Sequence, residues 1–111
     1  MGVSRSASGP LGDPALHVLL ALGTEPKHGY AVMQAAAERT AGRIRILPGT
    51  LYSTLKRLVA DGLVEECDPP AGHDSADARR RYYRVTRAGR AAVRESLDRL
   101  AVLVKLGKAF G

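Results

Sequence analysis

The stretch that follows Thr86 constrains the fold of this chain most. Its apolar residues recur at alternating spacings of four and three residues, which predicts a helix from about 87 to 108 with a coiled-coil-like seam. Beyond residue 100 a second apolar stripe joins the first, and one small domain cannot cover both stripes. We therefore expect a second copy of the chain to cover this helix. The interface residues expected on it are Val93, Leu97, Leu100, Leu103, Val104 and Leu106.

A short helix is expected near the start of the chain, over residues 14 to 22. The pair Asp13-Pro14 supplies its start, and Gly23 supplies its end. Because this helix is apolar on two sides, it must be buried on both, and we expect one side to meet the second subunit. Residues 1 to 12 are rich in serine and glycine and predict a flexible tail. The interface residues expected on the first helix are Leu16, Leu19 and Leu20.

Two more helices are expected in the middle of the chain. One follows a turn at residues 26 to 29 and runs from about 30 to 39. The other begins at a proline and ends at an Asp-Gly pair, over residues 48 to 61. Between them, arginine and isoleucine alternate over residues 43 to 46, which predicts a very short strand. The core stripe expected on the later helix is Leu51, Leu55 and Leu58.

A β-hairpin is expected next, with strands at residues 63 to 67 and 79 to 85 joined by a long turn. Thr86 can then cap the last helix. This order of elements is the winged helix-turn-helix plan, so we expect a mainly α fold with a small β-hairpin. At 111 residues the chain divides into a tail at 1–12, a winged helix-turn-helix domain at 13–86 and a dimerisation helix at 87–111.

The charge of the chain favours a polyanionic partner. Lysine and arginine number 17 against 11 acidic residues, which gives a net charge of +6. In the winged plan the third helix enters the major groove of DNA, and its expected outer face is small, polar and basic. Tyr52 has two interpretations, a contact to the sugar-phosphate backbone or packing under the wing. The DNA contacts expected on this helix are Gly49, Thr50, Tyr52, Ser53, Lys56 and Arg57, against the alternative of an ordinary solvated face.

The hairpin brings four arginines into six residues, a concentration of charge that suits phosphates or a narrow minor groove. Asp74 and Asp77 lie in the turn and would repel phosphate, so we do not expect its tip to insert deeply. His28 is interpreted as turn chemistry, and Tyr30 is a further candidate for a phosphate contact. The hairpin residues expected to contact DNA are Arg79, Arg80, Arg81 and Arg84.

Three blocks of residues sharpen this interpretation: HGYAVM at 28–33, LPGTLYSTLKRLVADGLVEE at 47–66 and RRRYYRVTRAGR at 79–90. In this order they closely resemble the PadR-like family of bacterial transcriptional regulators, over about residues 14 to 106. The resemblance implies a cytoplasmic homodimer, usually a repressor, that reads a roughly palindromic operator. It also implies a small-molecule effector near the dimer interface. With one helix after the wing, the chain resembles the short branch of the family.

Other classes of protein fit the sequence less well. Three scattered histidines and one cysteine show neither a nucleophile with its base nor metal-ligand spacing, so we expect no enzyme, no metal and no cofactor. No apolar run approaches the ~20 residues of a membrane span, and no signal-peptide stretch is present, which favours the cytoplasm. The main alternative is a winged-helix module that binds another protein without reading DNA.

Overall fold

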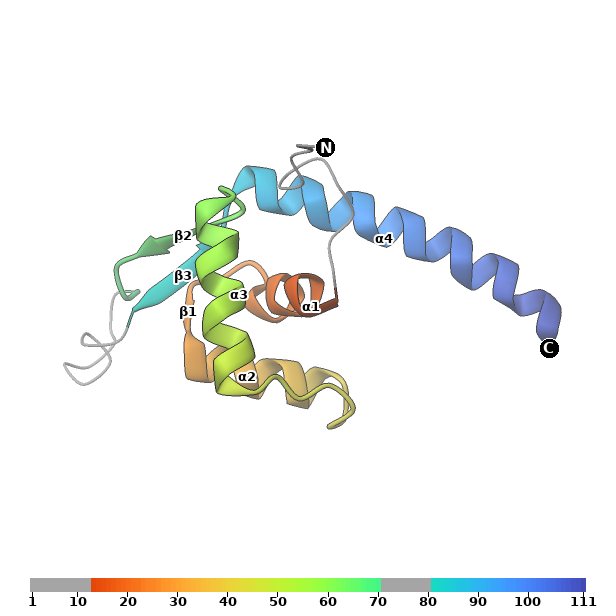
Figure 1. Ribbon diagram of the computed structural model, residues 1–111, viewed down its shortest axis with the longest axis horizontal. Helices are drawn as coiled ribbons and strands as arrows, with labels where there is room; N and C mark the ends of the chain where they lie inside the picture. Colours follow the sequence, from red (N-terminus) through yellow and green to blue (C-terminus); the bar gives the residue numbers. More distant parts are fainter. Residues whose placement is uncertain (1–12, 71–80) are drawn as a thin grey trace.

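The structure is a computed structural model that describes residues 13–70 and 81–111. In these ranges the chain folds into four α-helices, a short 3-10 helix and an antiparallel sheet (Figure 1). The mainly α winged helix-turn-helix fold expected from the sequence is confirmed. The helices are α1 (Asp13–Leu22), α2 (Gly29–Arg39), α3 (Pro48–Ala60) and α4 (Arg87–Gly107), with η2 (Lys108–Phe110) as the 3-10 helix. The strands are β1 (Lys27–His28), β2 (Val64–Cys67) and β3 (Tyr82–Val85).

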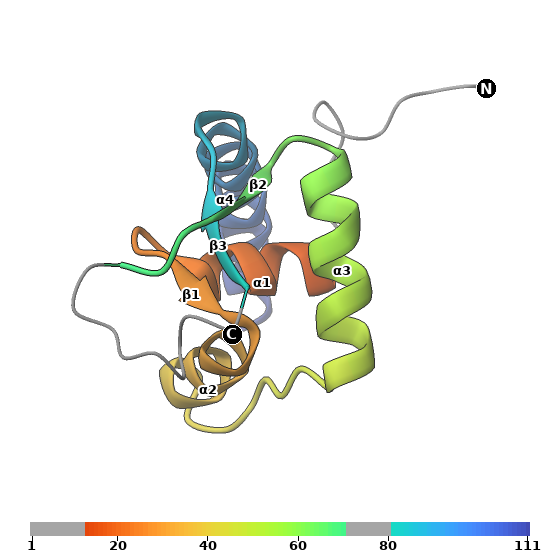
Figure 2. The same ribbon diagram turned by 90° about the vertical axis from the view of Figure 1, so that its left-hand side faces the viewer.

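The core forms around α1, which packs against α2, α3 and α4 (Figure 2). Val18 and Leu22 of α1 are fully buried. The stripe Leu51, Leu55 and Leu58 of α3 is at most 1% exposed, as the spacing predicts. Burial of each leucine stabilises the fold by roughly 1.5 to 3 kcal/mol. The orientation of α3 about its own axis is therefore determined by this stripe.

The sheet places β3 between β1 and β2, and the expected hairpin is formed by β2 and β3. Its register sets Glu65 opposite Arg84 and Glu66 opposite Tyr83. Because side chains alternate between the two faces of a strand, Tyr83 and Glu66 share one face while Arg84 and Glu65 share the other. Tyr83 belongs to the core cluster that includes the α3 leucines, so its face is the one turned toward α3.

The prediction of a strand at residues 43 to 46 is wrong. This segment is irregular, and the third strand is instead β1, which lies where the sequence indicated only a turn. Ile44 and Ile46 are partly buried against the core, and the amide of Ile44 donates to Oγ1 of Thr40 at 2.9 Å. The alternation of residues therefore reflects one-sided burial of a loop. The edge of β3 that does not pair with β2 pairs with β1, and no local pattern in the sequence reveals that long-range pairing.

The start of α4 is held against the hairpin by Thr86 and Gly89. Oγ1 of Thr86 accepts from the amide of Gly89 at 3.0 Å and donates to the carbonyl of Gly62 at 2.7 Å, which confirms the expected cap. The amide of Thr86 also donates to the carbonyl of Leu63 at 3.0 Å. A Cβ at Gly89 would overlap that same carbonyl oxygen, so glycine is required for this close approach. The direction of α4 is thus set by the wing.

The two halves of α4 have different surroundings. Gly89, Ala92 and Ser96 are buried against the domain, whereas every residue from Leu97 to the end is exposed. Figure 1 shows this second half projecting away from the remaining helices. Exposing a continuous apolar stripe of a helix to water, as on this second half of α4, is unfavourable.

On α1 the chain itself covers two residues that we expected at a subunit interface. Leu16 is 8% exposed and Leu19 is 2% exposed, since α2, α3 and α4 surround this helix. Only Leu20, at 40%, keeps substantial free surface. We therefore narrow the interface proposed on α1 to Leu20.

Candidate nucleic-acid interface

The outward face of α3 carries the polar and basic side chains. With its leucine stripe buried, the helix leaves exposed all six of the residues expected to contact DNA: Gly49, Thr50, Tyr52, Ser53, Lys56 and Arg57. The helix begins at Pro48, and a Cβ added to Gly49 would meet nothing within 4 Å. Its first turn is therefore open to the close approach of a partner.

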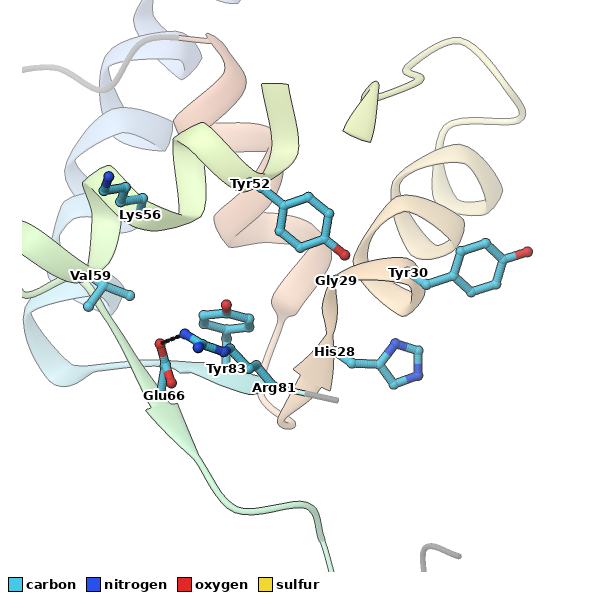
Figure 3. Close-up of a pocket in the computed structure, with 9 residues that line it drawn as sticks. All are labelled: His28, Gly29, Tyr30, Tyr52, Lys56, Val59, Glu66, Arg81 and Tyr83. Atoms are coloured by element: carbon cyan, nitrogen blue, oxygen red, sulfur yellow. Dashed lines mark hydrogen bonds and ion pairs between the residues drawn. The ribbon is translucent and has the colours of Figure 1, made fainter. Parts of the chain in front are cut away.

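An open cleft of about 800 Å³ lies between α3, the hairpin and the start of α2 (Figure 3). From α3 it is lined by Tyr52, Lys56 and Val59, which follow one another at helical spacing. Aromatic and cationic side chains together suit the sugars and phosphates of a nucleic-acid strand. The remaining lining residues are His28, Gly29, Tyr30, Glu66, Arg81 and Tyr83.

Tyr52 reaches from α3 toward the start of α2, where Gly29 leaves room for its ring (Figure 3). A Cβ at Gly29 would lie 2.5 Å from the hydroxyl oxygen of Tyr52 and 2.8 Å from its ring carbons, so the ring would have to move from this position. The ring remains 50% exposed. The structure places the ring against the start of α2, in the same cleft as Tyr83 of the hairpin and with one side facing solvent, and its contact to the sugar-phosphate backbone stays a prediction.

Arg81 and Glu66 form an ion pair on the hairpin side of the cleft (Figure 3). The guanidinium NH1 lies 3.3 Å from Oε2 of Glu66, and the two side chains are 74% and 49% exposed. An exposed pair of this kind contributes only about 0 to 1 kcal/mol, so a phosphate can replace the carboxylate. Burial, with the Glu66 carboxylate as a second cause, raises the pKa of the neighbouring Tyr83 phenol. Its hydroxyl is protonated at neutral pH, as in any tyrosine, and the raised pKa extends that range to more alkaline solution.

Arg84 does not share the cleft with Arg81. Its Nε donates to Oε2 of Glu65 at 2.6 Å on the opposite face of the hairpin, and this hydrogen bond raises the pKa of the guanidinium. Arg79 and Arg80 lie outside the described residues. Thus the two described arginines of the expected cluster point to different surfaces.

His28 serves the local turn, as the sequence indicated. Its Nδ1 accepts from the amide of Ala31 at 3.2 Å and caps α2, while its ring meets the edge of Tyr82 at 5.3 Å between centroids. Tyr30 is 55% exposed, and its ring points away from Tyr52 (Figure 3). Tyr30 is therefore positioned at the rim of the cleft.

Five residues that line the cleft were not among the expected DNA contacts, namely His28, Gly29, Val59, Glu66 and Tyr83. The period-two alternation of the hairpin is the signal that groups Glu66 with Tyr83. It does not reveal which face of the hairpin meets α3, because that depends on packing between distant segments.

Two negative findings apply to residues 13–70 and 81–111. No helix there is long and apolar enough to cross a membrane. Nor do three or more histidine, cysteine, aspartate or glutamate side chains gather there as a group able to hold a metal ion.

A buried inner face and an exposed basic outer face on α3, set beside a two-stranded wing, define the chain as a DNA-binding winged helix-turn-helix regulator. The particular family is shown by a family model described as "Transcriptional regulator PadR-like family", which matches residues 18–95. The chain belongs to this family, whose members are transcriptional regulators and not enzymes.

Individual relatives agree with this assignment. The chain is 41% identical over 90 residues to the transcriptional regulator Rv3488 of Mycobacterium tuberculosis, covering 78% of this chain and 77% of that protein. A PadR family transcriptional regulator from Eggerthella lenta superposes with a TM-score of 0.67 at 32% identity, covering 86% of this chain and 80% of the other. A PadR family regulator from Clostridium difficile superposes with a TM-score of 0.72 at 22% identity, covering 89% and 98%, and shows likeness of fold alone.

Proposed function

We propose that this chain binds duplex DNA as a homodimer and represses transcription from a roughly palindromic operator. The observation that carries the proposal is the two-sided character of α3. Its leucines are buried in the domain, while Thr50, Ser53 and Arg57 face outward beside a cleft that holds further cations. In winged helix-turn-helix proteins a helix so placed enters the major groove. Repression and a small-molecule effector near the dimer interface are supported by the family resemblance alone.

The outer face of α3 and the cleft would have different tasks on the duplex. Thr50, Ser53 and Arg57 carry short or forked donors that match base edges and phosphates. Lys56 and Arg81 line the cleft from opposite walls, so a single backbone strand lying between α3 and the wing would meet both cations. Phosphate contacts of this kind set the register of the protein, and the base contacts provide sequence specificity.

The homodimer is supported by the uncovered half of α4. Leu100, Leu103 and Leu106 are 42%, 59% and 64% exposed, and a monomer would keep this stripe in water. A twofold dimer would cover the stripe with the same stripe of a second copy. It would also set two α3 helices about one DNA turn apart, roughly 34 to 36 Å, which suits an operator with two half-sites.

The salt dependence of binding tests the proposal most directly. Operators are first selected from a random duplex pool, and affinity is then measured at several salt concentrations. Because cationic side chains displace condensed counterions, the logarithm of affinity should fall steeply and linearly with the logarithm of salt. A flat response, or the absence of any preferred duplex, would favour the protein-binding module instead.

Three variants divide the contacts by role. Arg57→Ala should weaken operator binding by about 1 to 3 kcal/mol and relax sequence preference, if its side chain reads a base. Arg81→Ala should weaken operator and random duplex equally. Arg99→Ala is the matched control, since this arginine is paired with Glu95 on α4. Equal effects of all three substitutions would mean that the interface is not built from α3 and the cleft.

A further inference from the structure

Leu47, which immediately precedes the first turn of α3, is an exposed leucine with no task in its own chain. It occupies the N-cap position of the helix, with φ −74° and ψ 150°, and its side chain makes no capping hydrogen bond. Its carbonyl accepts from the amide of Leu51 at 2.8 Å, which any residue could provide. Leu47 is 70% exposed, the highest exposed fraction of any leucine in the described residues.

This placement breaks two local rules at once. Serine, threonine, asparagine and aspartate are preferred at N-caps because their side chains satisfy a free amide, and leucine is among the poorest choices. Leucine normally recovers such a loss through burial, and Leu47 is not buried. Rules broken together in this way are expected where a residue serves a partner and not the fold.

The surroundings of Leu47 favour duplex DNA as that partner. Arg43 and Arg45 are exposed on the segment that leads into α3, and they provide the charge that a phosphate backbone requires. On the other side Leu47 continues directly into Gly49 and Thr50, which are exposed on the face proposed to enter the major groove. The N-terminal residues of a recognition helix are those that meet base edges.

We propose that Leu47 is a specificity-determining residue that recognises the C5-methyl group of a thymine in the major groove. This inference rests on the proposed function of the chain. The thymine methyl is the apolar group among the base edges of the major groove, and apolar side chains contact it. A leucine has no donor or acceptor in its side chain, so its favourable contact with a base edge there is with this methyl group.

The test removes each methyl group in turn. In a selected operator every thymine is replaced singly by deoxyuridine, which lacks only the C5-methyl, and affinity is measured for the natural protein and for Leu47→Ala. For the natural protein, at least one position should show a loss of about 3- to 10-fold, the value expected for one or two buried methyl-sized contacts. With Leu47→Ala the same replacement should have no effect.

Two control variants separate a thymine contact by Leu47 from a thymine contact by a neighbouring residue. Thr50→Ser removes the methyl group of the neighbouring candidate and should leave the deoxyuridine penalty intact, while Leu47→Met should keep most of it. Sedimentation and thermal unfolding of Leu47→Ala should match the natural protein, since the side chain contacts solvent.

Several results would overturn the inference: no thymine sensitive to deoxyuridine, a penalty that persists in Leu47→Ala, a penalty abolished by Thr50→Ser, or loss of the dimer in Leu47→Ala. Each of these leaves DNA binding by the natural protein intact. If the natural protein selects no duplex at all, the proposed function itself has failed.

Discussion

Gly49→Ala should make the protein more stable and its DNA binding weaker. Gly49 follows Pro48 in the first turn of α3, and an added Cβ would lie in open space. Alanine is preferred over glycine inside a helix by about 1 kcal/mol, and the first turn should retain a part of that gain, about 0.3 to 1 kcal/mol. For a domain of this size we expect the Tm to rise by about 1 to 8 °C.

The expected loss of DNA binding follows from the Cβ that alanine adds at position 49. If a phosphate approaches the free amides of the first turn, a Cβ at this position increases the distance between them. Loss of one hydrogen bond to a charged group costs about 1.5 to 3 kcal/mol, which corresponds to about 10- to 150-fold in affinity. Opposite changes in stability and binding would distinguish a residue retained for its partner from one retained for the fold.

Thermal unfolding and titration of a fluorescent operator measure the two quantities. Gln34→Ala is a control, because this residue is also helical and exposed, carries no charge and lies outside the proposed DNA and dimer contacts. It should leave operator affinity unchanged. If Gly49→Ala raises the Tm and binds the operator as tightly as the natural protein, the first turn of α3 does not approach the duplex closely and the reasoning is wrong.

Three further predictions concern the dimer, the cleft and the cysteine. Leu100→Glu should give monomer or aggregate and lose operator binding, since a carboxylate in the proposed seam costs roughly 2 to 5 kcal/mol; a normal dimer in sedimentation would refute the seam. Glu66→Gln should strengthen duplex binding about 2- to 5-fold, because the substitution frees Arg81 from its ion pair. Glu65→Gln, on the other face of the hairpin, should change duplex binding less, and equal effects of the two substitutions in a binding titration would contradict this account. Burial, the largest cause, raises the pKa of the Cys67 thiol, so a smaller fraction of the thiol is ionised at neutral pH. Alkylation should therefore become fast only at a higher pH than in the unfolded chain. A rate profile with its midpoint at or below that of the unfolded chain would count against this account.

Much of the fold could be predicted because its signals are local. The leucine stripe of α3, the cap at Thr86 and the long seam after it all arise from spacings of three and four residues or from one side chain acting on its own turn. The exposed face of α3 followed directly, since it is the side opposite the stripe. The candidate contacts on this helix were therefore located without knowledge of the rest of the molecule.

Other parts of the site depend on residues far apart in the chain. The partner of Arg81 is Glu66, fifteen positions earlier, and only the register of the hairpin decides which acidic residue each arginine meets. The position of Tyr52 depends on Gly29 of another helix. Period-two alternation can group residues on one face of the hairpin, but it does not show that this face meets α3 and α2, so the cleft itself could not be predicted.

By itself the sequence determined which segments become helices and which sides of them face the core, because the period of apolar residues is a property of each segment alone. The tertiary structure alone decided that β1 and not residues 43 to 46 completes the sheet, since β1 pairs with a strand far along the chain and such a pairing depends on long-range packing. It likewise decided that Leu19 belongs to the chain's own core while Leu100 remains exposed. An apolar stripe requires cover, but what covers it depends on where the neighbouring helices end.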